Sequence, residues 1–282
     1  MNLESGNVIL AIDVGNSRIK FGLFAPASAK TLGSQLPECA FSLALPVHEP
    51  VVWQNVIGMT VPAGTGIANA IVAGPNPAGV DLVVLTWPDN GWPKPRVISR
   101  AAELPLRVAL EFPDKVGIDR LLNAVAANAI RPSDRPALVV SAGTATTIDL
   151  VLADGTFAGG AILPGLELGA RALHQHTALL PLIDIPSLLR AQVDPLGQDT
   201  PAAIRSGLWH GQVGAIRELT ARLTETVGSS PKIIVTGGNG RWLAASLGPD
   251  FHFEADLALR GLACVAQAND SRSASGEGTN AR

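Results

Sequence analysis

Hydrophobic and polar residues form two matching strand–turn–strand patterns, one near the start of the chain and one near its middle. The first is AIDVGNSRIKFGLF, residues 11–24, in which Gly15 interrupts two apolar runs. The second is VVSAGTATTIDLVLADG, residues 139–155, in which Gly143 stands at the matching place. Each pattern predicts two strands joined by a glycine turn. When the two are laid over one another, the aligned pairs are Asp13 with Ser141, Gly15 with Gly143, and Asn16 with Thr144.

A helical period replaces this pattern in two places. In GIDRLLNAVAANAI, which begins at Gly117, apolar residues recur at helical spacing until Pro132 closes the helix. A long helix is predicted over Thr200–Val227, with Thr200 as its N-cap and Pro201 as its first helical residue. The other predicted elements are strands over residues 8–13, 19–24, 137–141, 146–152 and 232–235, and helices over residues 166–173 and 257–266.

The composition suits a chain with a substantial core and no strong electrostatic partner. The 282 residues are 47% apolar, which fits one large domain or two ordinary ones. A net charge of −3 gives no reason to expect nucleic acid or an anionic membrane as a partner. No apolar run is long enough to span a bilayer, and no signal peptide is recognised, so a cytoplasmic location is expected. Cys39 and Cys264 have no metal-binding spacing and are expected to be buried thiols.

The paired glycine turns predict a nucleotide site. A glycine turn lets backbone N–H groups approach a phosphate, and an acid just before it can hold Mg²⁺ against phosphate oxygens. The plainer alternative is that each turn merely closes a hairpin. The matched pair, together with Thr236-Gly237-Gly238 after a predicted strand, favours the nucleotide. The chain has neither a P-loop motif nor a dinucleotide-binding glycine motif, so those two folds are excluded.

Two further segments are candidates for a substrate site. Asp119 and Arg120 lie at a helix start, where Asp119 could accept a proton from a hydroxyl and Arg120 could bind an anion. The alternative is an acid that only stabilises the helix N-terminus. Residues 159–181, GGAILPGLELGARALHQHTALLP, could form a wall of a binding site or only a sharp strand-to-helix connection. Within them, His174 and His176 are expected to be ordinary histidines rather than metal ligands, because residues i and i+2 do not face each other on a helix.

Together these blocks identify a resemblance to the type III pantothenate kinases, of the actin-like and sugar-kinase ATPase superfamily. The matching stretches are DVGNSRIK within residues 9–24, PDKVGIDRLLNAVAA at 113–127, residues 141–150, residues 159–181, TPAAIRSGLWHGQVGAI at 200–216, and the Thr236-Gly237-Gly238 segment. Residues 25–105 hold many prolines and show no convincing match; only Thr86–Pro95 is predicted, as a loop.

The resemblance implies an α/β fold of two actin-like (ribonuclease H-like) domains. Each would be a mixed five-stranded sheet with helices, with an ATP cleft between them. The expected domains are residues 1–131, with the first phosphate motif and the GIDR helix, and residues 132–268, with the second phosphate motif and the TGG motif. The last helix could pack back on the first domain, and residues 269–282 would be a disordered tail.

The resemblance also implies a reaction and its residues. ATP with Mg²⁺ would phosphorylate the 4′-hydroxyl of pantothenate, the first step of coenzyme A biosynthesis, in a homodimer that also uses a monovalent cation, K⁺ or NH₄⁺. Asp119 would be the general base and Asp13 would lie at Mg²⁺. The residues expected to bind ATP are Asp13, Val14, Gly15, Asn16, Ser17, Arg18, Ile19, Lys20 and Thr144. The residues expected to bind pantothenate are Gly117, Ile118, Asp119, Arg120 and Thr177, the last across the dimer.

Two positions depart from the family's pattern. Ser141 stands where the family usually has an acid that binds the monovalent cation, and a neutral hydroxyl is a far weaker cation ligand. The family's tyrosine shortly before the GIDR motif is absent, because the chain has no tyrosine; Phe112 could replace its ring but not its hydroxyl. These departures leave two alternatives open, a catalytically silent relative with a regulatory or accessory role, and a kinase for another small polar substrate.

Overall fold

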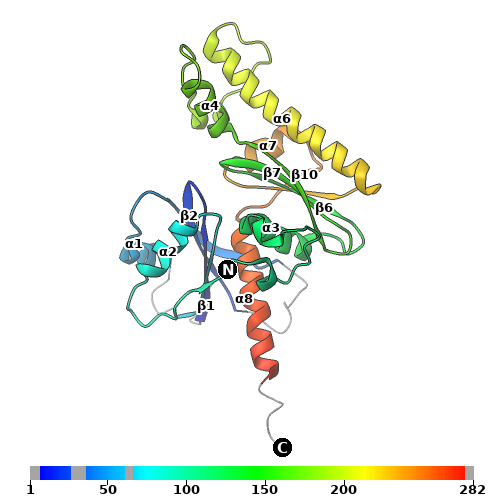
Figure 1. Cartoon of the computed structure of the whole chain (residues 1–282). Helices are drawn as coiled ribbons and strands as arrows, with labels where there is room; N and C mark the ends of the chain where they lie inside the picture. The colour runs from blue at the N-terminus through cyan, green and yellow to red at the C-terminus, as the bar shows by residue number, and fades with distance from the viewer. Residues whose placement is uncertain (1–6, 27–35, 61–65, 277–282) are drawn as a thin grey trace, which may run out of the picture. The chain divides into compact units, whose positions relative to one another are not determined.

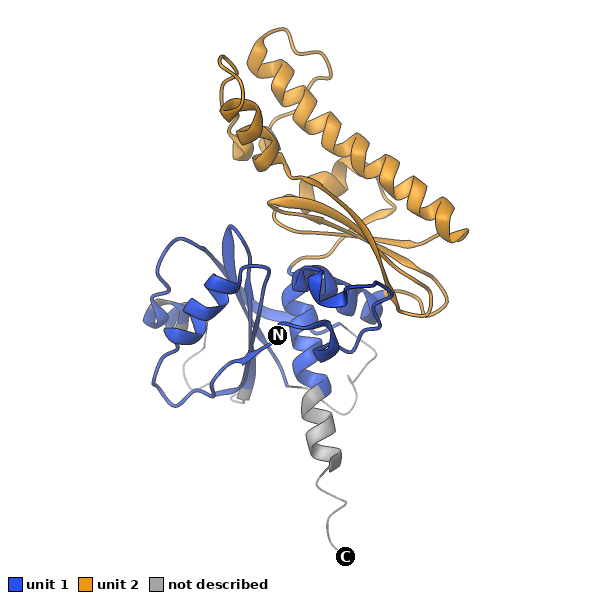
Figure 2. Cartoon of the chain, in the orientation of Figure 1, with its two compact units in different colours: residues 1–130, 256–282 blue, residues 131–255 orange. Residues whose placement is uncertain are grey.

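Each half of the chain builds one five-stranded sheet, and the two sheets have the same strand order. The computed structural model describes residues 7–26, 36–60 and 66–276. The chain divides into two compact units (Figure 2). Unit 1 comprises residues 1–130 and 256–282, and unit 2 comprises residues 131–255.

The sheet of unit 1 has the order β3-β2-β1-β4-β5. Its strands β1 and β2 are labelled in Figure 1. The strands β1, β2 and β3 are antiparallel neighbours, whereas β4 and β5 run parallel to β1. The bounds of these strands are β1 Asn7–Val14, β2 Arg18–Phe24, β3 Cys39–Pro46, β4 Gly66–Ala73 and β5 Arg96–Val97. The helices of the unit are α1 Trp53–Thr60, α2 Pro77–Leu85, α3 Ile118–Ile130 and α8 Leu257–Gly276.

Helices cover both faces of β1, which explains why this strand is apolar at nearly every position. Leu10 and Ile12 belong to a buried cluster with Trp53 of α1 and Val80 of α2. The helix α8 contacts β1, β2 and β4 and packs along α3. Gly261 makes that last contact possible, since a Cβ there would lie 2.2 Å from the carbonyl oxygen of Leu122. The GIDR helix is therefore held in place by the last helix of the chain.

Unit 2 repeats the plan of unit 1. Its order is β8-β7-β6-β9-β10, with β6, β7 and β8 antiparallel and β9 and β10 parallel to β6. The helices α6 and α7 pack on one face of the sheet. The bounds are β6 Ala137–Ala142, β7 Ala145–Val151, β8 Phe157–Pro164, α4 Leu166–Gln175, α5 Ile185–Arg190, α6 Thr200–Val227, β9 Lys232–Thr236, α7 Gly240–Leu247 and β10 Phe251–Phe253.

The structure differs from the predictions at three places. Residues 256–268 belong to unit 1 rather than to a C-terminal domain of 132–268, because α8 packs on the first sheet, as the prediction for the last helix allowed. The helix α8 runs to Gly276, although disorder was predicted from residue 269; residues 277–282 lie outside the described residues. The N-cap of α6 is Asp199 and not Thr200, because the Asp199 carboxylate accepts from the Ala202 N–H at 2.6 Å.

Candidate functional site

The first glycine turn closes the end of β1 in unit 1. The Gly15 N–H donates to the Arg18 carbonyl at 2.9 Å, and Asp13 lies directly across from Lys20 on β2. Gly74, just after β4, approaches so closely that a Cβ there would lie 2.1 Å from the Val14 oxygen. The side chains of Asn16, Ser17 and Arg18, in contrast, are exposed. The segment predicted to contact phosphates is thus a tight turn with outward-facing polar groups.

Asp13 is held in an environment that opposes its ionisation. Its Oδ1 atom is buried and has no hydrogen-bond partner among the described residues. Burial raises the pKa of Asp13 from 3.8 to about 6; the positive charge of Lys20 lowers it, and the negative charges of Asp119 and Asp256 raise it further. A carboxylate that is partly desolvated and has an unpartnered Oδ1 atom is suited to binding a divalent cation.

The negative charge of Asp119 contributes to the raised pKa of Asp13, and both acids belong to unit 1. Asp119 is in the first turn of α3, whose N-terminus favours a negative charge. The absence of a side chain at Gly117 makes room for this carboxylate, because a Cβ there would lie 2.7 Å from Asp119 Oδ1. Asp119 and its neighbour Arg120 are both half-buried.

Asp256 is a member of this charged group that sequence reasoning missed. Its Oδ1 atom accepts a hydrogen bond from Lys20 Nζ at 3.4 Å, across 236 residues of sequence. The available signal was an acid directly before an apolar helix, which is typical of an N-cap. That signal predicts a role at the helix end, but nothing in the sequence indicates the pairing with Lys20.

The second glycine turn lies at one end of the sheet of unit 2. The Gly143 N–H donates to the Ala145 carbonyl, and the Gly165 N–H, at the start of α4, donates to the Thr144 carbonyl, both at 3.0 Å. A Cβ on Gly165 would lie 2.3 Å from the Gly143 oxygen. Gly237 has φ +92°, and a Cβ there would lie 2.5 Å from the Ala142 oxygen. The backbone of the TGG segment therefore packs directly against the backbone at the end of β6, with no side chain between them. The Thr144 side chain is exposed.

Ser141 lies in a row of hydroxyl groups. It is in register with Thr147 on β7 and Thr236 on β9, so these three side chains share one face of the sheet. The Thr147 hydroxyl donates at 2.9 Å to Asp149, a carboxylate that is only 1% exposed and that sequence reasoning did not single out. Ser141 thus offers a neutral hydroxyl, and the Asp149 carboxylate is bonded to Thr147, the cross-strand neighbour of Ser141.

Thr177 lies away from Thr144. The two residues are at opposite ends of α4, a ten-residue helix and therefore about 15 Å long. Thr177 lines a cavity of about 1070 Å³ between α4 and the first half of α6, together with His176 and Asp199. Its hydroxyl donates to the Leu173 carbonyl at 2.7 Å. This cavity is large enough for a small polar molecule.

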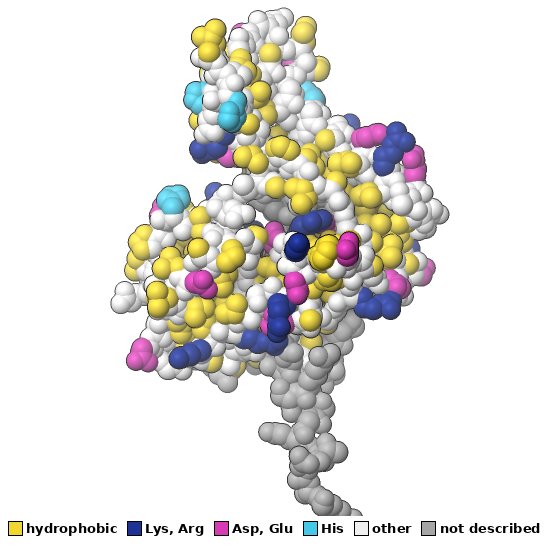
Figure 3. All heavy atoms as spheres, in the orientation of Figure 1, with side chains coloured by type: hydrophobic (Ala, Val, Ile, Leu, Met, Phe, Trp, Pro, Cys, Tyr) yellow, Lys and Arg dark blue, Asp and Glu magenta, His cyan; other side chains and the backbone are white. Residues whose placement is uncertain are grey.

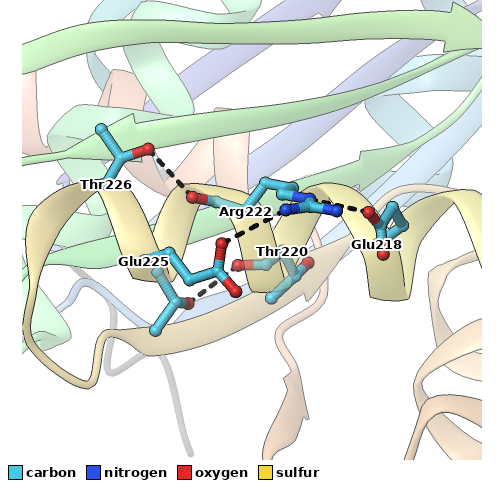
Figure 4. Close-up of polar contacts among 6 residues, drawn as sticks. Glu218, Thr220, Arg222, Glu225 and Thr226 are labelled. Carbon is cyan, nitrogen blue, oxygen red and sulfur yellow. Dashed lines mark hydrogen bonds and ion pairs between the residues drawn. The ribbon is translucent and has the colours of Figure 1, made fainter.

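A second cavity of unit 2, of about 690 Å³, lies between β8 and the end of α6, with Arg222 at its edge. Arg222 is already paired, with Glu218 at 2.8 Å and Glu225 at 3.6 Å (Figure 4). Its charge is therefore balanced along the helix, and the cavity offers no free cation from this residue for an anionic ligand.

No cluster of three or more histidine, cysteine, aspartate or glutamate residues suited to a metal occurs in the described part of the chain. The His174 Nδ1 atom lies 2.8 Å from the Leu180 carbonyl oxygen. None of the helices in the described ranges is long and apolar enough to cross a membrane. On the face seen in Figure 3, charges of both signs are interspersed, as expected for a chain with a net charge of −3.

Comparison with known proteins gives matches along most of the chain. The family described as Type III pantothenate kinase matches residues 9–222. A type III pantothenate kinase of Paramagnetospirillum magneticum is 34% identical over 94% of this chain and 98% of its own length. That of Caulobacter vibrioides is 39% identical, but the match covers 60% of this chain and 63% of the relative, less than two thirds of its length.

Two solved structures share the fold. A Campylobacter jejuni protein described as a Baf family transcriptional activator has a TM-score of 0.57 and 18% identity, covering 93% of this chain and 99% of its own. The activator of 2-hydroxyisocaproyl-CoA dehydratase from Clostridium difficile was solved with bound ADPNP. It has a TM-score of 0.53 and 10% identity, and the match covers 98% of this chain and 99% of the activator. At these identities the likeness concerns the fold alone.

Proposed function

Because the chain belongs to the type III pantothenate kinase family, we propose that it transfers the γ-phosphoryl group of ATP to the 4′-hydroxyl of pantothenate, the first step of coenzyme A biosynthesis. One observation carries the proposal beyond family membership. Asp13, beside the phosphate-type turn, and Asp119, at the start of the GIDR helix, act on each other electrostatically within one unit. Phosphoryl transfer needs a metal-binding acid and a base close together, and this pair supplies both.

Asp13 would hold Mg²⁺, which when bound neutralises the charge of the β- and γ-phosphates. The buried, unpartnered Oδ1 atom supports this role. Lys20 and the backbone of the turn around Asn16 would bind the phosphates, whereas the Gly15 N–H is already bonded to the Arg18 carbonyl. The turn suits this task because glycine keeps a Cβ away from the ligand. Thr144, exposed on the equivalent turn of unit 2, would contact ATP from the second domain.

Asp119 would accept the proton of the 4′-hydroxyl as it attacks the γ-phosphorus. A positioned general base contributes roughly 10²–10⁴-fold to such a reaction. Arg120, next in the same helical turn, would bind an anionic group of pantothenate or a phosphoryl oxygen. Gly117 contributes by leaving room for the Asp119 carboxylate.

Pantothenate binding would also involve Thr177, across the interface of a homodimer. The cavity beside Thr177, between α4 and α6, supports a binding role for this region. The hydroxyl of Ser141 supports the loss of the family's monovalent-cation site, so we propose that turnover depends weakly or not at all on K⁺ or NH₄⁺.

The test is ADP release by purified protein with ATP, Mg²⁺ and pantothenate. We expect turnover that depends on pantothenate, and a loss of about 10²–10⁴-fold in Asp119→Asn with an unchanged melting temperature. The matched control is Asp114→Asn, an exposed acid just before the same helix, which should leave the rate unchanged. Full activity in Asp119→Asn would remove this residue from the role of base.

The same assay addresses the two alternatives. Ser141 and the missing tyrosine favour a catalytically silent relative, which would give no pantothenate-dependent ADP under any ionic condition. A kinase for another small polar substrate would likewise release no ADP in response to pantothenate, but it would release ADP when its own acceptor is supplied.

A further inference from the structure

The ion pair between Lys20 and Asp256 stands out because another acid lies directly opposite Lys20 in the sheet register. Lys20 is paired directly with Asp13 across β1 and β2. Side chains of such a pair have Cβ atoms about 4.5–5.5 Å apart. Yet the Lys20 ammonium donates to Asp256 at 3.4 Å, and Asp13 Oδ1 keeps no hydrogen-bond partner among the described residues. The Lys20 ammonium is therefore bonded to Asp256 rather than to its cross-strand neighbour, although its charge still acts on Asp13.

The backbone of Asp256 is unusual in a way that supports a positional role. Its φ of +50° lies in the left-handed region, where no other non-glycine residue of the described ranges is found. Aspartate enters this region more readily than most residues, but still at a cost in free energy. Such outliers are retained where the surrounding structure demands them. Here the position is the point at which the chain re-enters unit 1.

Neighbouring contacts fix this conformation. The Asp256 carbonyl accepts from the Arg260 N–H at 3.0 Å, so Asp256 lies directly before α8 and accepts the first hydrogen bond of its first turn. The Arg260 guanidinium donates from Nε to the Pro37 carbonyl at 2.9 Å. With α8 packed closely on α3 through Gly261, the Asp256 carboxylate is carried by an anchored helix. Both side chains of the pair are only partly exposed, 28% for Lys20 and 23% for Asp256, which limits screening by solvent.

We propose that Asp256 is a positioning residue that holds the Lys20 ammonium away from Asp13 and so leaves the Asp13 carboxylate open for the Mg²⁺ of the nucleotide complex. Without Asp256, the flexible lysine, with three donors on a four-carbon stem, would turn to the adjacent Asp13. An Asp13–Lys20 ion pair would occupy the oxygens that the metal needs. This inference rests on the proposed function, since it assumes that Asp13 binds Mg²⁺.

The experiment measures the binding of Mn²⁺, a paramagnetic substitute for Mg²⁺, to the full chain with a non-hydrolysable ATP analogue, by electron paramagnetic resonance. We expect Asp256→Asn to weaken Mn²⁺ binding about three- to tenfold. Asp256→Gly, which accepts the left-handed backbone but lacks the carboxylate, should show the same loss. The matched control is Asp250→Asn, an exposed acid six residues earlier, which should bind Mn²⁺ like the wild type.

A double-mutant comparison shows whether Asp256 acts through Lys20. The Lys20→Met variant has no ammonium group that could pair with Asp13. Adding Asp256→Asn to this variant should therefore change its Mn²⁺ affinity by less than about twofold. An equal loss in both backgrounds would overturn the proposal, because Asp256 would then act on the metal by its own charge. Wild-type Mn²⁺ affinity in Asp256→Asn or Asp256→Gly would overturn it as well.

This readout separates the inference from the proposed function. Metal–nucleotide binding needs no pantothenate, so a wild-type protein that binds Mn²⁺ with nucleotide but does not phosphorylate pantothenate would refute the reaction alone. A wild-type protein that binds no Mn²⁺ with nucleotide would refute both.

Discussion

Replacing Asp13 by asparagine should make the protein more stable at neutral pH while removing its metal-binding acid. Burial raises the pKa of Asp13 to about 6, against 3.8 for an ordinary aspartate. A folded-state pKa above the unfolded-state value means that the folded protein binds more protons between those two values. Stability therefore falls as the pH rises from about 4 to about 6, and the ionised carboxylate remains unfavourable at higher pH.

The magnitude follows from the size of this pKa difference. Each pKa unit corresponds to about 1.4 kcal/mol, so a difference of about two units gives an upper value of about 3 kcal/mol. Because Asp13 is partly exposed, part of this energy is lost to solvent screening, and we expect Asp13→Asn to gain about 1–3 kcal/mol at pH 7.5. Below about pH 4 the wild-type carboxyl is protonated, and the gain should vanish.

The assay is urea denaturation followed by tryptophan fluorescence, without Mg²⁺ and nucleotide, at pH 7.5 and at pH 4. Asp250→Asn, which removes an exposed acid, is the control and should change the free energy of unfolding by less than about 0.5 kcal/mol at both values. A destabilised Asp13→Asn at pH 7.5, or an equal gain at both pH values, would refute the reasoning.

Three other predictions concern the glycines and the monovalent cation. Gly117→Ala should lower kcat with little change in melting temperature, because its Cβ would lie 2.7 Å from the mobile end of the Asp119 side chain. Gly165→Ala should lose about 1–3 kcal/mol of stability, measured by urea denaturation, because its Cβ would meet the Gly143 backbone at 2.3 Å. Its control, Gly214→Ala, has open space around it and should gain about 0.5–1 kcal/mol as a helical alanine. Titration of K⁺ against a Na⁺ control should show weak activation or none, and a strong, saturable requirement for K⁺ would contradict the loss of that site.

The repeated strand–turn–strand patterns could be predicted from sequence because they depend on local residues. Apolar alternation and the glycines at positions 15 and 143 define the two hairpins, and the structure confirms two sheets of the same order. The helical period of residues 200–227 was equally clear, and the observed bounds of α6 agree with it. Resemblance to the family supplied the fold, which the comparisons confirm.

Other features depend on contacts that no local pattern encodes. The helix α8 joins unit 1 because Gly261 fits against Leu122, and neither residue indicates this in its own segment. Residues 39–46 and 77–85 form β3 and α2, but prolines and short apolar runs conceal them in the sequence. The pairing of Lys20 with Asp256 spans 236 residues and exists only in the folded chain.

The roles of Asp119, Thr144 and Thr177 remain predictions, since they concern bound substrates. Within unit 1, the structure adds the electrostatic proximity of Asp119 to Asp13. Within unit 2, it places Thr144 and Thr177 at opposite ends of α4, consistent with proposed contacts to two different molecules.

The most direct test of the proposed function is identification of the product. Wild-type protein incubated with ATP, Mg²⁺ and pantothenate should yield pantothenate phosphorylated on its 4′-hydroxyl, detected by ³¹P nuclear magnetic resonance and mass spectrometry, with one ADP for each product molecule. Asp119→Asn should yield almost none under the same conditions. A wild-type reaction that leaves pantothenate unmodified would contradict the assignment of this chain as a pantothenate kinase.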